Sequence, residues 1–143
     1  MVDKVHISWV DFHQHAKLLA EKIKKTGSYN KIIAVSRGGL IPACIIAYEL
    51  DIRNTQAINI SNYDHQDRRD SPEINIKCDA FQADEQTLII DDLSDTGQTF
   101  RLLRTMFPRA TLASVYAKAK GSKDVDLYAV DIPDRWLVFP WDI

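Results

Sequence analysis

The segment "LIIDDLSDTGQTF", residues 88–100, is the strongest indication of the fold in this sequence. A short apolar run ends in two adjacent aspartates, Asp91 and Asp92, and a third aspartate, Asp95, follows three residues later. The segment Thr-Gly-Gln-Thr then opens a helical pattern. An apolar run that ends at polar residues before a glycine turn and a helix is typical of a strand in a parallel α/β sheet.

Strand and helix patterns alternate along the rest of the chain. Short apolar runs predict strands at 31–36, 55–61, 74–77, 87–91, 111–118, 127–130 and 136–139. Apolar residues spaced three and four apart predict helices from Trp9 to Lys25, over 41–50 and over 97–107. Because this alternation shows no internal repeat, it predicts one α/β domain, residues 1–143, with a mostly parallel central sheet flanked by helices.

Composition narrows the class of protein further. A length of 143 residues suits one compact core, and a formal net charge of −2 argues against a general polyanion binder, so no nucleic-acid partner is expected. The two cysteines, Cys44 and Cys78, have no metal-ligand spacing. No signal peptide and no apolar run of about 18 residues is present, so we expect no integral membrane segment and a cytoplasmic location.

Unusual residues lie at the ends of three predicted strands. The strand 31–36 ends in Ser36-Arg37-Gly38-Gly39, the strand 87–91 ends in Asp91-Asp92, and the strand 111–118 ends in Lys118. In open parallel sheets, ligands bind at the carboxyl ends of the strands. The three strand ends therefore predict one shared binding site, whereas each alone could be an ordinary turn.

The chemistry of these segments points to a phosphorylated sugar. The stretch 96–99 offers N–H groups, hydroxyls and a helix dipole to a phosphate, although no P-loop or dinucleotide fingerprint occurs. Asp91 and Asp92 suit Mg²⁺ or sugar hydroxyls. Arg37, beside two glycines, suits a second phosphate group. The pattern predicts a sugar with a phosphate at one end and a metal-bound diphosphate at the other.

The stretch "LIIDDLSDTGQT" resembles the phosphoribosyl pyrophosphate (PRPP) motif of the type I phosphoribosyltransferases: apolar residues, two acids, two variable residues, then Asp-Thr-Gly-x-Thr. The stretches "IIAVSRGGLIPA", "ISNYDH", "YAKAKG" and "VDIPDRWLVFPWD" are similar to the xanthine–guanine branch of that family. The likeness runs from Trp9 to Asp142. It implies the type I fold, with a mobile active-site loop at 62–73 and a small base-binding hood at 127–143.

The resemblance also implies an activity. It is the transfer of 5-phosphoribosyl from PRPP to N9 of a 6-oxopurine (guanine, xanthine or hypoxanthine), with release of pyrophosphate. Mg²⁺ would be the cofactor, and the assembly a homodimer or homotetramer. Two alternatives remain: a non-catalytic sensor of PRPP or a nucleotide on the same fold, and an enzyme that acts on a pyrimidine or another base.

In the sugar and phosphate part of the site, the resemblance assigns roles to matching residues. Asp91 and Asp92 would hold the ribose and the metal–diphosphate, with Asp92 as the metal ligand, and Asp95 would be the general base near the purine N7. The 5-phosphate would bind to Thr96, Gly97, Gln98 and Thr99. The diphosphate would bind to Ser36, Arg37 and Gly38, where the family often has a non-proline cis peptide, and to Arg68 or Arg69 from the loop.

In the purine part of the site, three residues match. Lys118 would donate to O6, Trp136 would stack on the base, and the Leu137 carbonyl would meet the group at C2. Trp136 could instead be part of the core. This chain departs from the family pattern at Gln98, usually glycine in this branch, and at Lys120, usually neutral.

Four other conspicuous residues receive no role in the site. We expect His15 on the surface, Trp9 in hydrophobic packing, and Arg101 and Arg104 as solvated or paired surface charges.

Overall fold

The computed structural model describes residues 4–61, 73–76 and 82–143. Its main sheet has six strands in the order β4-β3-β2-β5-β6-β7. These are β2 (Lys31–Ser36), β3 (Thr55–Ser61), β4 (Glu73–Ile76), β5 (Thr87–Ser94), β6 (Thr111–Ala117) and β7 (Leu127–Asp131). Only β4 runs antiparallel to its neighbour. The prediction of a mostly parallel sheet is therefore confirmed.

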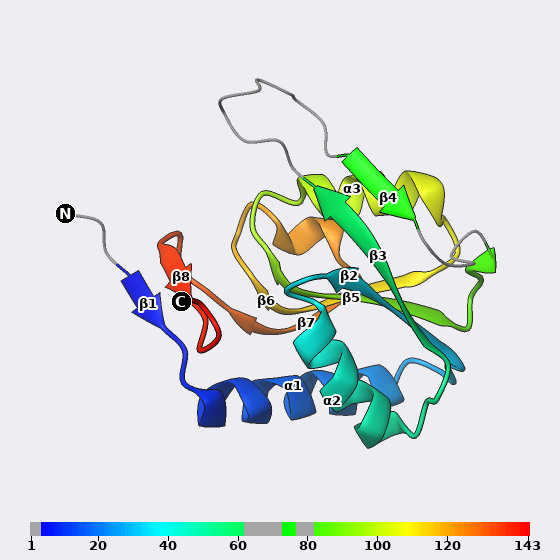
Figure 1. The fold of residues 1–143 in the computed structure, drawn as a ribbon, viewed down its shortest axis with the longest axis horizontal. Coiled ribbons are helices and arrows are strands. Elements are labelled where there is room, and N and C mark those ends of the chain that lie inside the picture. The colour runs from blue at the N-terminus through cyan, green and yellow to red at the C-terminus, as the bar shows by residue number, and fades with distance from the viewer. Residues whose placement is uncertain (1–3, 62–72, 77–81) are drawn as a thin grey trace.

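Helices cover both faces of this sheet (Figure 1). α1 (Trp9–Lys24) and α2 (Leu40–Leu50) lie on one side and α3 (Gln98–Met106) on the other. The central strands β2 and β5 contain continuous buried apolar runs, which is typical of strands covered on both faces. Ile32 and Ile90 face the core of α1 and α2, whereas Ile33 and Ile89 face that of α3. Each fully buried isoleucine contributes about 1.5–3 kcal/mol.

The strand β5 is longer than the sequence predicts. It was expected to end at Asp91 but continues to Ser94, because Asp91, Leu93 and Ser94 pair with Ser114, Tyr116 and Ala117 of β6. The two adjacent aspartates therefore lie within the paired part of the strand rather than in the turn after it.

A second, two-stranded sheet lies beside the main one, at the left of Figure 1. β1 (Lys4–His6), which the sequence analysis did not predict, pairs in parallel with β8 (Trp136–Val138). The predicted hood 127–143 is thus divided, because β7 belongs to the main sheet. The hood in the structure combines β8 and the residues after it with β1 from the other end of the chain.

The predicted mobile loop at 62–73 and the predicted diphosphate role of Arg68 or Arg69 cannot be compared with the structure. Residues 62–72, which include Arg68 and Arg69, lie outside the described residues, as does Cys78. Glu73 begins β4.

None of the helices in the described ranges is long and apolar enough to cross a membrane.

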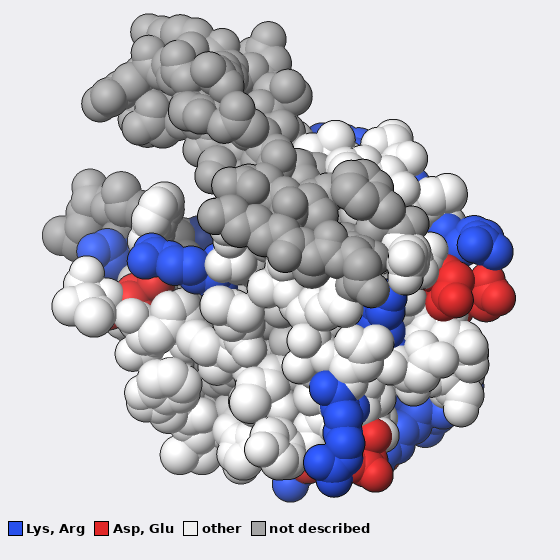
Figure 2. All heavy atoms as spheres, turned by 45° about the vertical axis from the view of Figure 1, so that its right-hand side comes forward, with Lys and Arg blue, Asp and Glu red and all other residues white. Residues whose placement is uncertain are grey.

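Charged side chains are dispersed over the surface. Figure 2 shows basic and acidic groups scattered over the face in view, in places side by side. The described pairs Arg109–Glu85, at 3.3 Å, and Lys24–Glu21, at 3.2 Å, are exposed, and such pairs contribute only about 0–1 kcal/mol.

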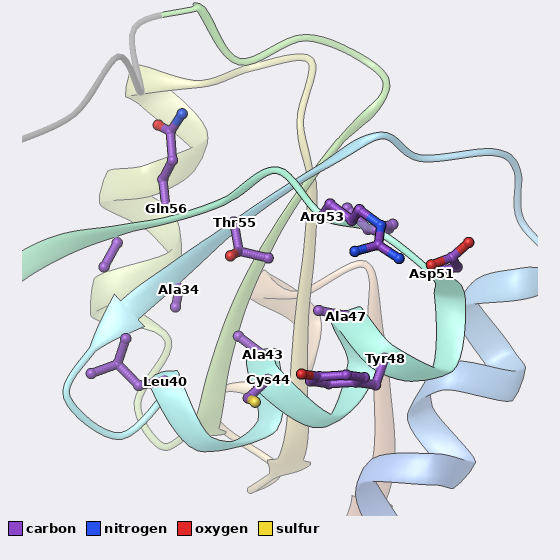
Figure 3. Close-up of a pocket in the computed structure, with 12 residues that line it drawn as sticks. Ala34, Leu40, Ala43, Cys44, Ala47, Tyr48, Asp51, Arg53, Thr55 and Gln56 are labelled. Atoms are coloured by element: carbon purple, nitrogen blue, oxygen red, sulfur yellow. The ribbon is translucent and has the colours of Figure 1, made fainter.

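A groove of about 620 Å³ lies between α2 and β3 (Figure 3). Its walls include Leu40, Cys44 and Tyr48 from α2, and Thr55 and Gln56 from β3. The described residues predicted to form the site are not among those that line it. The candidate chemistry therefore lies elsewhere, at the carboxyl ends of the central strands.

Candidate active site

The turn between β5 and α3 forms the predicted phosphate loop. Gly97 is the N-cap of α3 and has φ of 89°, which glycine adopts at little cost. The Thr96 Oγ1 accepts a 3.4 Å hydrogen bond from the Gln98 N–H. Because Gly97 has no side chain to cap α3, the positive end of the helix dipole is suited to a bound anion.

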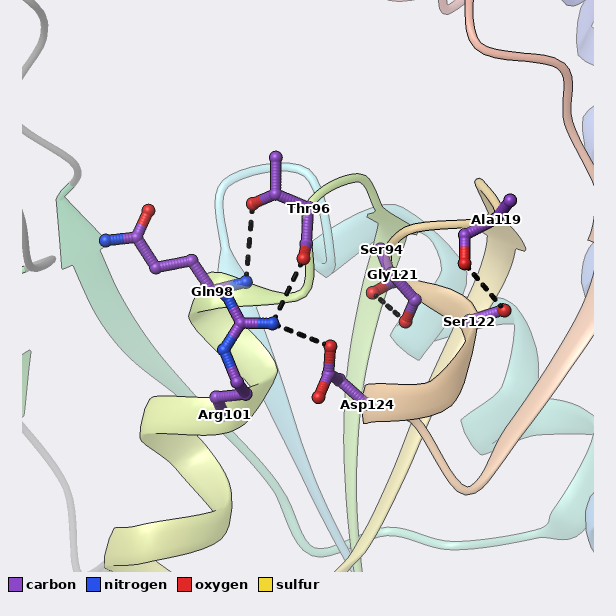
Figure 4. Close-up of polar contacts among 8 residues, drawn as sticks. All are labelled: Ser94, Thr96, Gln98, Arg101, Ala119, Gly121, Ser122 and Asp124. Carbon is purple, nitrogen blue, oxygen red and sulfur yellow. Dashed lines mark hydrogen bonds and ion pairs between the residues drawn. The ribbon is translucent and has the colours of Figure 1, made fainter.

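This loop is tied to the segment that follows β6 (Figure 4). The Ser94 Oγ donates to the Gly121 carbonyl at 2.7 Å, and the Lys118 N–H donates to the Ser94 carbonyl at 3.0 Å. A Cβ on Gly121 would lie only 2.5 Å from the Ser94 carbonyl oxygen, so the two segments approach closely because this residue is glycine.

Asp91 and Asp92 are the acids in the described chain whose pKa values depart most from the usual value. The Asp92 N–H donates to Asp91 Oδ1 at 2.8 Å. Burial, and then the charge of Asp92, raises the pKa of Asp91 well above its usual value. Burial likewise raises the pKa of Asp92. Two partly buried carboxylates held this close are stabilised by a cation, and their oxygens are the ligands that Mg²⁺ takes in proteins.

The predicted diphosphate loop contacts these acids. The Ser36–Arg37 peptide bond is cis, as the resemblance implies. A Cβ on Gly38 would collide with the Asp92 carboxylate, and one on Gly39 would collide with the Ile90 carbonyl oxygen. The two glycines therefore allow this loop to pack directly against β5. Arg37 is exposed, so its guanidinium is accessible from solvent.

Lys118 and Asp95 meet between the predicted sugar and purine regions. The Lys118 side chain is 10% exposed, and its Nζ lies 3.3 Å from Asp95 Oδ1. It also lies 3.9 Å from Asp134 Oδ1, on the hood side. The structure thus brings together residues that follow β5, β6 and β7 and are far apart in the sequence.

The hood presents one tryptophan to solvent and buries the next residue. Trp136 is 64% exposed and Leu137 is 7% exposed. The alternative that Trp136 is part of the core is therefore wrong for this structure. Trp141 anchors the hood instead: its ring stacks on Phe139 at 4.6 Å and packs edge-on against Phe12 of α1 at 4.9 Å.

Two of the residues without a predicted role, Trp9 and His15, differ from expectation. Trp9 is 56% exposed, although its ring lies 5.9 Å from that of Trp141. His15 is only partly exposed because its Nδ1 hydrogen-bonds the Tyr116 hydroxyl at 2.8 Å. Burial raises the pKa of Tyr116. Arg101 is paired, as expected, but with a partner beside the phosphate loop.

Two acids near the site, Asp124 and Asp134, were not predicted from the sequence. Asp124 pairs with Arg101 at 2.8 Å, and Asp134 faces Lys118. Asp134 could have been found from its position two residues before Trp136. Nothing in the sequence alone pairs Asp124 with Arg101.

With this geometry, the chain has the fold and the motif arrangement of a phosphoribosyltransferase. Residues 8–143 match the family model described as the phosphoribosyl transferase domain, and the chain belongs to this family.

Three similar proteins illustrate the relationship. The chain is 41% identical over 138 residues to the xanthine-guanine phosphoribosyltransferase of Idiomarina loihiensis, covering 96% of this chain and 86% of that protein. It is 44% identical over 137 residues to the protein of the same name from Nitratidesulfovibrio vulgaris, covering 95% and 83%. The purine phosphoribosyltransferase of Pyrococcus horikoshii superimposes with a TM-score of 0.81 at 30% identity, covering 98% of this chain and 95% of that one.

Proposed function

We propose that this protein transfers 5-phosphoribosyl from PRPP to N9 of a 6-oxopurine, yielding the nucleoside monophosphate and pyrophosphate, with Mg²⁺ as the cofactor. The relatives named for xanthine and guanine support the class of acceptor. Preference among guanine, xanthine and hypoxanthine depends on the backbone around Leu137, where the group at C2 would lie.

The observation that carries this proposal is the 3.3 Å contact between Lys118 Nζ and Asp95 Oδ1. Asp95 is the last acid of the PRPP motif, and Lys118 is the residue expected to recognise the purine. Because the two side chains touch, a base bound at Lys118 would lie beside the reacting carbon of a sugar bound to the motif.

The phosphoribosyl half would stabilise the transition state through charge. Glycosyl transfer passes through an oxocarbenium-like transition state, and the carboxylates of Asp91 and Asp92 would favour its positive charge. Arg37 would stabilise the negative charge that develops on the leaving diphosphate. Bound Mg²⁺ would neutralise part of the same charge, with Asp92 as its protein ligand.

The purine half would select and orient the acceptor. A lysine ammonium only donates hydrogen bonds, so Lys118 favours a 6-oxo over a 6-amino group. Trp136 offers an exposed ring for stacking, and Asp95 would accept the proton at N7 as N9 attacks. The Asp95–Lys118 contact would open as the base enters, with each side chain turning to its own purine atom.

A direct assay tests the proposal. The protein is incubated with PRPP, Mg²⁺ and guanine, xanthine, hypoxanthine, adenine or uracil, and nucleoside monophosphate is measured. PRPP binding is measured separately by calorimetry. We expect product with at least one 6-oxopurine and little with adenine. PRPP binding without turnover on any 6-oxopurine would favour the non-catalytic sensor, and turnover with a pyrimidine alone would favour the other enzyme. A cytoplasmic location and a homodimer or homotetramer stay predictions.

A further inference from the structure

Arg101 lies one helical turn after Gly97, under the predicted phosphate loop (Figure 4). One nitrogen of its guanidinium, Nη1, donates to the Thr96 carbonyl at 3.1 Å and to Asp124 Oδ2 at 2.8 Å. Arg101 is 56% exposed, whereas the Asp124 side chain is 18% exposed. Arg101 thus connects a backbone carbonyl of the loop to a largely buried carboxylate.

Asp124 comes from the same segment as Lys118, the lysine expected to bind the purine. It ends the 3₁₀ helix η2 (Ser122–Asp124), which follows Lys118 within a few residues. The same segment holds the loop at Ser94 through the Gly121 carbonyl. The Arg101–Asp124 pair therefore adds a second, outer tie between the phosphate loop and the strand end of β6.

The loop packs tightly against this pair. A Cβ on Gly97 would collide with the Asp124 carboxylate and would lie 2.9 Å from Arg101 Nη1. Glycine is favoured at position 97 by its φ of 89°, and any side chain there would displace the Arg101–Asp124 pair.

The contact also orients one peptide group. In a trans peptide, the carbonyl oxygen and the following N–H point in opposite directions. The Thr96 carbonyl is held by Arg101, so the Gly97 N–H points away from Arg101. The partially negative carbonyl is thereby kept off the side of the loop where an anion would bind.

We propose that Arg101 and Asp124 form a positioning brace for the 5-phosphate: they hold the Thr96–Gly97 peptide so that its N–H is presented to the phosphate and its carbonyl is not. This role is additional to the motif residues themselves, and it rests on the proposed function. Arg101 acts through the backbone of the loop and does not contact the reacting atoms.

The next turn of α3 supplies a matched control. Arg104 makes the same kind of double contact, to Asp126 Oδ2 at 2.6 Å and to the Ala110 carbonyl at 3.0 Å. These partners lie at the opposite end of the helix from the phosphate loop. Arg104→Gln therefore removes a comparable ion pair without touching the loop.

The test measures binding and turnover for Arg101→Gln, Arg101→Lys and Arg104→Gln. Ribose 5-phosphate probes the 5-phosphate site by calorimetry, and inorganic pyrophosphate probes the diphosphate site. We expect Arg101→Gln to raise the Kd for ribose 5-phosphate and the KM for PRPP by about threefold to tenfold, the effect of losing one charge-assisted contact. The pyrophosphate Kd and the purine KM should stay near wild type. Arg101→Lys should restore part of the loss, and thermal unfolding verifies that each variant is folded.

Three outcomes would overturn the brace: unchanged ribose 5-phosphate binding in Arg101→Gln, an equal loss in Arg104→Gln, or an equal loss for pyrophosphate. Failure of the proposed function gives a different result. In that case the wild type does not turn over, and weaker ribose 5-phosphate binding in Arg101→Gln alone still supports the brace.

Discussion

The two halves of the candidate site are built in different ways. The phosphoribosyl half is largely one continuous segment, 91–99, shaped by local contacts such as the Asp92 N–H to Asp91 Oδ1 bond and the left-handed Gly97. The purine half joins the end of β6 to a hood in which β8 pairs with β1. Its anchor, Trp141, packs on α1 through Phe12.

Because of this difference, we expect different substitutions to affect PRPP binding and purine binding. The segment 91–99 is shaped mainly by local contacts and is tied to the chain after β6 at only a few points, whereas an assembled pocket depends on every element that supports it. We therefore expect substitutions in 91–99 to alter the KM for PRPP or kcat. Substitutions in the hood should instead alter the KM for the purine. Asp95 and Lys118 are in contact where the two halves of the site meet, so substitutions at these residues test the separation of the halves most directly.

The largest effect is expected for Asp95→Asn. Loss of the general base should lower kcat by about 100-fold while PRPP binding is largely kept. Asp134→Asn is the matched control, since it also removes a carboxylate near Lys118, at 3.9 Å, and should change kcat by less than about threefold. Steady-state kinetics and PRPP calorimetry measure both. Unchanged turnover in Asp95→Asn would remove this residue from the mechanism.

Lys118→Met should come next. Methionine keeps the apolar stem but leaves the purine O6 without its charged donor, so we expect the purine KM to rise by about 30-fold. The KM for PRPP should change little. Lys120→Met, an exposed neighbour, serves as the comparison. Equal increases in both KM values would mean that the two halves are not separable at Lys118.

Trp136→Ala should have a smaller effect, raising the purine KM by about tenfold through loss of stacking. Because Trp136 is 64% exposed, its melting temperature should match that of the wild type. Trp141→Ala should instead lower the melting temperature as well as purine affinity, because Trp141 is packed against Phe12 and Phe139. A large loss of stability in Trp136→Ala would contradict its assignment as an exposed stacking ring.

The smallest effect concerns stability and pH. The native state holds the Asp91 proton more tightly than the unfolded chain does, because burial and Asp92 raise its pKa above the usual 3.8. Ionisation of Asp91 therefore costs stability as pH rises from about 4 through the raised pKa. Asp91→Asn removes this cost and should raise the melting temperature at pH 7 by about 3 °C.

The gain in Asp91→Asn should disappear near pH 3, where the carboxyl is protonated in both states. PRPP binding should weaken at the same time, because a functional carboxylate is lost. Thermal unfolding at the two pH values measures the effect. A lower melting temperature at pH 7 would show that Asp91 stabilises the fold in its ionised form.

Several features of the fold and site could be predicted from sequence because their signals are local. The apolar runs of β2 and β5, the helical spacing from Trp9 and the glycine turn at Gly97 each depend on neighbouring residues. The end of β5 could not be predicted, because Asp92 is a poor strand former and the strand is extended beyond it by the pairing of Leu93 and Ser94 with β6. The three-residue β1 was also missed, since it exists only through β8.

The alternation of strands and helices, the chemistry of segment 91–99 and, through resemblance, the family follow from the amino-acid sequence. These depend on composition and spacing along one stretch of chain. The exposure of Trp136, the contact between Lys118 and Asp95, and the hold of Arg101 and Asp124 on the Thr96 carbonyl follow from tertiary packing alone. Such contacts join residues distant in the chain, and packing rather than local pattern selects which of the possible partners meet.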